Sequence, residues 1–136
     1  MSRHVDYLAA CKVALDAVAE ITYKVYDSFD HIGTRDMDGV IEMDQGDRFP
    51  ASDIGGDPHL EAYGIVCIVA ARTDLSDPKV TRKALDDQLD YMRDALRLVP
   101  GYSGVHEFRA VPNPQPMAND GIEYTWAAVS WQTYEG

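Results

Sequence analysis

The sequence has few basic residues and no concentrated basic patch. Lys and Arg number 12 among 136 residues against 23 Asp and Glu, which gives a formal net charge of −11. Phosphate backbones and anionic lipid headgroups repel a chain this acidic unless its basic side chains gather in one place. Simple binding to nucleic acid or to a membrane surface is therefore disfavoured.

Cysteines and long apolar runs are also scarce. Cys11 and Cys67 lie in apolar surroundings without a CxxC motif, and we interpret both as reduced, buried side chains. The best apolar run, from Gly64 to Ala71, has the length of a strand and falls short of the roughly 20 residues of a membrane span. Acidic residues interrupt the apolar positions of the N-terminus, so we expect no signal peptide, no membrane partner and a soluble, cytosolic protein.

Familiar signatures of metal, cofactor and catalytic sites are missing. The four histidines share no zinc-type spacing. The acidic run from Arg35 to Asp47 lacks the Gly and Glu positions of an EF-hand loop. Glu107 and Arg109, with Glu123 brought near by a hairpin, could support acid–base chemistry, but cross-strand charge pairing explains them better. The sequence predicts no metal, no cofactor and no catalytic residue.

Hydrophobic periodicity indicates two main helices and several strands. Apolar residues at helical spacing predict helices over residues 5–20 and from about 76 to 99, the second ending at Pro100-Gly101. We expect the strand at 60–72 to be central, with both faces covered, and the last two strands to form a long hairpin. The strands predicted from alternating or continuous apolar residues are 21–26, 60–72, 105–111 and 122–134.

These elements predict a single α+β domain over residues 1–136, with a mainly antiparallel, mixed sheet of about four to five strands and two main helices. Residues 27–58 carry nine acidic residues against two arginines, together with many glycines. Only residues 40–43 resemble a strand, so we expect most of this segment to be a long exposed loop that works by contact. The prolines at 112–121 predict a projecting turn.

Aromatic residues occupy both faces of the last predicted strand. Alternation places Trp131 and Tyr134 on opposite faces of that strand. One small core covers only one face of a strand, so large aromatic residues on both faces indicate an oligomer interface.

The order of these parts resembles the tail terminator proteins of long-tailed, lambda-like siphophages. The resemblance covers most of residues 1–26 and 59–136. It is carried by an amphipathic N-terminal helix, by HLEAYGIVCIVA, by DLSDPKVTRKALDDQLDYMRDALRLVPGYSG and by the ending GIEYTWAAVSWQTYEG, in a small acidic protein. Membership would imply an α+β subunit that forms a homohexameric ring on the tail tube, stops tail polymerisation and presents a surface to the head connector.

The resemblance implies a structural virion protein of the tail, assembled in the host cytoplasm, and not an enzyme. Its partners would be copies of itself, the tail tube protein and the head-tail connector or neck protein, while DNA would only pass through an acidic lumen. A neck or tail-completion adaptor of the same fold remains an alternative. A small α+β ligand-binding protein or enzyme, with a pocket beneath the central helix, is a less favoured one.

We expect partner and subunit contacts in the acidic segment, in the proline-rich turn and on the last strand. Charge reversal in the acidic segment, at Asp36, Asp38, Glu42 and Asp44, is expected to leave the fold intact because exposed carboxylates contribute little to stability. The candidate contact residues are Arg35, Asp36, Asp38, Glu42, Asp44, Arg48, Asn113, Gln115, Met117, Asn119, Trp131 and Tyr134.

Overall fold

A computed structural model describes residues 3–29, 36–102, 105–112, 117–119 and 121–134, with only the backbone of 112 and 117–119. The strands form one sheet in the order β1-β2-β3-β6-β4, and β5 also pairs with β6. Only β1 and β2 run parallel; the other neighbours are antiparallel. The elements are α1 (Arg3–Asp16), β1 (Lys24–Tyr26), β2 (Val40–Pro50), the 3-10 helix η1 (Ala51–Ile54), β3 (Glu61–Arg72), α2 (Pro78–Leu96), β4 (Glu107–Pro112), β5 (Met117–Asn119) and β6 (Ile122–Tyr134).

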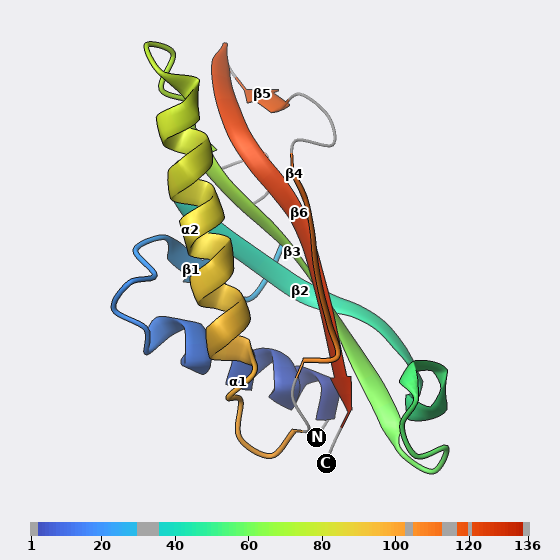
Figure 1. Cartoon of the computed structure of the whole chain (residues 1–136). Coiled ribbons are helices and arrows are strands. Elements are labelled where there is room, and N and C mark those ends of the chain that lie inside the picture. Colours follow the sequence, from blue (N-terminus) through green and yellow to red (C-terminus); the bar gives the residue numbers. More distant parts are fainter. Residues whose placement is uncertain (1–2, 30–35, 103–104, 113–116, 120, 135–136) are drawn as a thin grey trace.

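Both helices pack on one face of the sheet, as Figure 1 shows. The α2 residues Leu85, Met92 and Leu96 are at most 1% exposed and meet alternate residues of β3 and β6 in the main core. Pro78 lies in the first turn of α2, and Gly101 adopts a left-handed φ of 82° shortly after the helix ends. The predicted α+β fold, with two helices on a mainly antiparallel mixed sheet, is confirmed.

The first helix is shorter than predicted because a side chain of α2 forms hydrogen bonds with the backbone that follows it. Gln88 of α2 is 6% exposed, and its Oε1 accepts hydrogen bonds from the backbone N–H groups of Thr22 and Tyr23 at 3.0 and 3.3 Å. Its Nε2 donates to the carbonyl oxygen of Glu20 at 3.0 Å. These three contacts satisfy backbone groups between α1 and β1, so the chain needs no further helical turns there.

The central position of β3 is confirmed, but its second face is covered only in part, at Ala70, which belongs to a second buried cluster with Met37, Val40 and Tyr124. The helices cover the side of Ile65 and Val69 only. On the other side Val66 is 37% exposed and Ile68 is half-buried. A continuous apolar run does not by itself distinguish a doubly covered strand from one with a surface for a partner.

The prediction of a long exposed loop at 27–58 is wrong for its second half. β2 extends to Pro50 and pairs with β3 along nearly its whole length. A register shift between Gln45 and Arg48 disrupts the alternation that sequence analysis looks for. Glycine permits this bulge, because a Cβ on Gly64 would lie 3.0 Å from the Asp47 carbonyl oxygen.

Candidate functional site: the open face of the sheet

On the face of the sheet opposite the helices, a second buried cluster of Met37, Val40, Ala70 and Tyr124 closes one end. Among the described residues, the rest of this face over β3, β6 and β4 is uncovered, and we call that part the open face. Cross-strand register places Val66, Ser130 and Arg109 in one row of this face. Small residues lie in the neighbouring rows, with Gly64 in one and Ala128 in the other. Large side chains therefore surround small ones, and the face is hollowed rather than flat.

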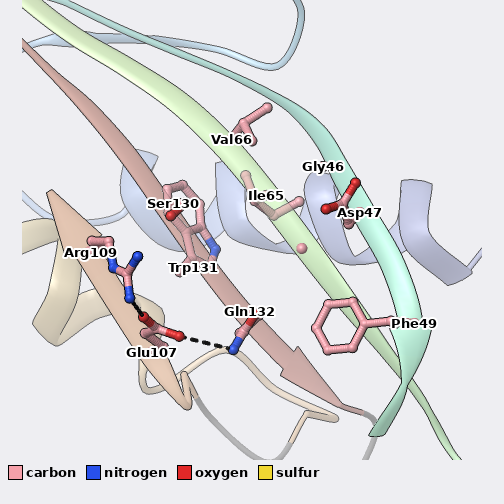
Figure 2. Close-up of a pocket in the computed structure, with 11 residues that line it drawn as sticks. Gly46, Asp47, Phe49, Ile65, Val66, Glu107, Arg109, Ser130, Trp131 and Gln132 are labelled. Carbon is pink, nitrogen blue, oxygen red and sulfur yellow. Dashed lines mark hydrogen bonds and ion pairs between the residues drawn. The ribbon is translucent and has the colours of Figure 1, made fainter. Parts of the chain in front are cut away.

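One hollow is polar and has a volume of about 240 Å³. Figure 2 shows Asp47 and Phe49 of β2 on one side and Arg109 and Glu107 of β4 on the other. The Arg109 guanidinium lies 2.5 Å from one Glu107 carboxylate oxygen, and Gln132 Nε2 donates to the other at 3.2 Å. The rim of the hollow thus carries an exposed ion pair.

A second hollow, of about 300 Å³, adjoins the first and shares Val66, Arg109 and Ser130 with it. Its remaining lining is mainly apolar and includes Phe29, Ile68, Val111, Trp126 and Ala128. Val66 is 37% and Val111 45% exposed. The two hollows form one surface with an apolar half and a charged half.

The structure does not assemble the acid–base set of the less favoured enzyme hypothesis. Glu107 is paired with Gln132 across the sheet, whereas Glu123 is paired with Ala118. Gln132 lies nine positions after Glu123 along β6, which is about 30 Å of extended strand. Arg109 and Gln132 each donate to one carboxylate oxygen of Glu107. This carboxylate therefore takes part in cross-strand pairing.

Asp36 and Asp38 are anchors of the chain rather than projecting charges. The Arg72 Nη2 lies 2.6 Å from Asp36 Oδ2, and the Tyr124 hydroxyl donates to Asp36 Oδ1 at 3.0 Å. The Arg72 guanidinium holds the pKa of the Asp36 carboxyl below its usual value. Asp38 Oδ1 accepts the backbone N–H of Arg72 at 2.9 Å. Met37 between them is 2% exposed, so these contacts fix the segment against the sheet.

Glu42 is fully buried, which contradicts its expected place on an exposed loop. It lies in the middle of β2, in a cross-strand row between Tyr26 of β1 and Ile68 of β3. Asp44, two residues on, is half-buried, and its Oδ2 accepts the backbone N–H of Phe29 at 3.2 Å. Glu42 shares the face of Val40 and Ile68, opposite the helices, so the β2 side of that face is closed around it.

The remaining candidates are dispersed. Trp131 is 2% exposed in the main core, so its assignment to a subunit interface is wrong. Tyr134 is half-buried and stacks on His106 with 4.4 Å between ring centroids. Arg48 forms an exposed ion pair with Glu61 at 2.6 Å.

The other candidates lie in or beside the proline-rich turn and the acidic segment. Met117 and Asn119 belong to β5 through their backbone. Arg35, Asn113 and Gln115, with most of the proline-rich turn, lie outside the described residues.

A third hollow, which we call the helix groove, lies between α1 and the end of α2 and has a volume of about 540 Å³. Val13 is 69% and Leu98 80% exposed. The apolar spacing of the sequence does not reveal this groove, although Leu98 falls outside the buried spacing of α2. All its lining residues are apolar: Ala10, Val13, Ala14, Ala17, Val18, Ala95, Leu98 and Pro100.

The two cysteines are free and buried, as predicted. Burial raises the pKa of the Cys11 thiol to about 11 and that of Cys67 well above its usual value. Both side chains therefore behave as small apolar groups at neutral pH.

Among the described residues, no group of three His, Cys, Asp or Glu side chains is arranged to hold a metal ion. No helix in the described part of the chain has both the length and the apolar character needed to cross a membrane.

Comparison with known proteins gives no match to a family model and none to a curated protein.

Proposed function

We propose that the chain is a structural protein of a long-tailed phage that caps the tail tube as a homohexameric ring. In this role it stops tail polymerisation and forms the joining surface for the head connector or neck protein. The observation that carries the proposal is the open face, which combines exposed apolar side chains with an exposed ion pair.

The composition of the open face is typical of a protein–protein contact. Such contacts have an apolar centre that includes aromatic residues, with arginine and other polar groups toward the rim. Val66, Val111 and Trp126 provide the apolar part, while Arg109 and Glu107 provide the charged part. A sheet that needed no partner would gain solubility from polar side chains at Val66 and Val111.

Two further features support a ring with a lumen. The α+β fold agrees with what the resemblance to tail terminators implies. The net charge of −11 suits a channel through which DNA passes without binding, because acidic walls repel phosphates. The proposed partners are therefore copies of the chain, the tail tube protein and the connector, with DNA only in transit.

The proposal is tested by adding the purified protein to tail tubes of the phage that encodes it, assembled without this protein. The wild type should bind tube ends as a six-chain ring and restore joining to heads. Val111→Glu should reduce tube or head joining at least tenfold, because it places a charge in the apolar half of the open face. Val5→Glu is the matched control, since Val5 is 48% exposed on α1, on the other side of the sheet.

A wild-type protein that neither forms rings nor binds tube ends would contradict the proposal. Binding to the head side alone would instead favour the neck or tail-completion adaptor, which would use the same face. Genome context gives an independent check, because the proposal expects genes for a tail tube and a tape-measure protein beside this one.

A further inference from the structure

We propose that two copies of this chain pair through the outer edges of their β4 strands, in the antiparallel register that centres on Phe108. The partner is a second copy because this edge is complementary to itself. In that register Glu107 of each copy lies opposite the partner's Arg109. The inference goes beyond the proposed function, since it concerns the form that the chain takes before it meets a tail tube.

The β4 edge has the features of a strand that accepts a partner. β4 is the last strand in the sheet order and pairs, among the described residues, with β6 alone. Figure 2 shows β6 between β3 and the strand that carries Glu107 and Arg109. The edge of a sheet presents backbone N–H and C=O groups that a further strand can bind. Bulges often protect such edges, but β4 pairs with β6 over Glu107–Pro112 without a register shift.

The alternation of β4 defines which register is complementary. Glu107, Arg109 and Val111 border the hollows of the open face. Phe108 and Ala110 pack on the helix side. In an antiparallel pair of identical strands, opposite residues share a face, so the two-fold axis passes through a residue. An axis at Glu107 or Arg109 sets like charges opposite each other. Of the five axes from Glu107 to Val111, only the one at Phe108 sets Glu107 opposite Arg109, and it does so twice.

The charges around this edge do not oppose the pairing. On β6 the residues beside Glu107 and Arg109 are Gln132 and Ser130, and both are uncharged. Asp47, which also borders the polar hollow, lies on β2, with β3 and β6 between it and β4. The contact between Glu107 and Arg109 within one chain is exposed, at 47% and 68% of the two side chains, so both groups can also reach a strand alongside.

Phe108 supports the same axis from the helix side of the sheet. It is half-buried and stacks on Trp131 with 6.0 Å between ring centroids. An axis at Phe108 makes the rings of the two copies direct cross-strand neighbours. Aromatic pairs are among the side-chain pairs that stabilise antiparallel strands. The pairing therefore removes the exposed part of this ring from water and extends an existing aromatic contact.

The pair is distinct from the proposed ring. A two-fold contact closes with two chains, whereas a ring of six repeats a head-to-tail contact. The pair is therefore the free form of the chain, and two short strand edges make it weak and dependent on protein concentration. Glu107 and Arg109 also border the polar hollow, so a partner that binds this rim competes with the pair. Contact with a tail tube then shifts the chain from pairs to the ring.

The test is sedimentation velocity over a series of protein concentrations, without tail tubes. The wild type should form two-chain species as its concentration rises. Arg109→Glu and Glu107→Arg should each weaken pairing at least about tenfold, because each sets like charges opposite each other. Lys83→Glu and Asp87→Arg are the controls. They make the same charge changes at an exposed ion pair of α2 and should leave pairing nearly unchanged.

Two combinations separate the register from a general effect of charge. The double variant Glu107→Arg/Arg109→Glu is again complementary to itself and should pair like the wild type. An equimolar mixture of the two single variants should form mixed pairs, because every Glu of one chain then lies opposite an Arg of the other. Amide hydrogen exchange in β4 should slow in the paired form of the wild type.

A wild type that stays monomeric up to millimolar concentration would overturn the inference, as would pairing that neither single variant weakens. A double variant that stays monomeric, or a mixture without mixed pairs, would exclude this register. Six-chain rings formed without tail tubes would also overturn the pair as the free form, while leaving the proposed function standing. Circular dichroism verifies the fold, and Arg109→Asp with Glu107→Lys replace any single variant that does not fold.

Discussion

Arg72 and Asp36 lie 36 residues apart in the chain and are joined by two hydrogen bonds, Nη2 to Oδ2 at 2.6 Å and Nε to Oδ1 at 3.3 Å. The contact ties the segment before β2 to the end of β3. Asp38 also bonds the chain at Arg72, and Glu42 is fully buried, so charge reversal at Asp36, Asp38 or Glu42 would remove contacts of the fold.

We predict that Asp36→Asn lowers the melting temperature at pH 7 and has a smaller effect at pH 3. The Asp36 pKa is lowered in the folded state, so its contribution is present above the unfolded pKa of about 4 and is lost as pH falls through the folded value. Thermal denaturation at both pH values measures the difference. Asp86→Asn, at an exposed position of α2, is the control. An equal effect of Asp36→Asn at both pH values would contradict the prediction.

We predict that Glu42→Lys prevents folding or lowers the free energy of unfolding by about 3–5 kcal/mol, because it places a new charge at a fully buried position. Asp44→Lys, at a half-buried position of the same strand, should cost clearly less. Urea denaturation of both variants provides the comparison. Equal losses in the two variants would show that Glu42 is accessible to solvent.

We predict that Gln88→Ala lowers the free energy of unfolding by about 2–4 kcal/mol, because it leaves the backbone groups of Glu20, Thr22 and Tyr23 without their partner. Gln88→Glu keeps the two accepted N–H bonds but sets a buried carboxylate against the Glu20 carbonyl, so it should also be destabilised while keeping the Thr22 and Tyr23 amides bonded. Amide hydrogen exchange should increase at Thr22 and Tyr23 in the Ala variant. Unchanged exchange at these two amides would rule out the capping role.

We predict that iodoacetamide does not label Cys11 or Cys67 in the folded protein at pH 8. Both thiols are buried, and their raised pKa values leave little thiolate. Intact mass measurement should show two additions in denaturant and none without it. Ala9→Cys, at an exposed position of α1, should label rapidly and serves as the positive control. Labelling of Cys11 or Cys67 at the rate of this control would overturn the prediction.

The candidate site was predictable only in part. Its strands β3, β4 and β6 follow from apolar patterning, but the open face itself does not. Gly64, Ser130 and Ala128 form its hollows only because the register sets them beside one another. The helix groove likewise depends on how α1 crosses the end of α2.

The sequence by itself determined α2 and the long strands β3 and β6, because the spacing of apolar residues is a local signal within each element. For α2, Pro78 at its start and Gly101 shortly after its end also mark its limits. Tertiary structure alone decided the length of β2, the burial of Glu42 and the inward position of Trp131. The physical reason is that pairing with β3 satisfies the backbone of β2 whatever its side chains are, and the bulge at Gln45–Arg48 shifts their alternation. Likewise, only packing of the helices against one face decides which side of β6 becomes core.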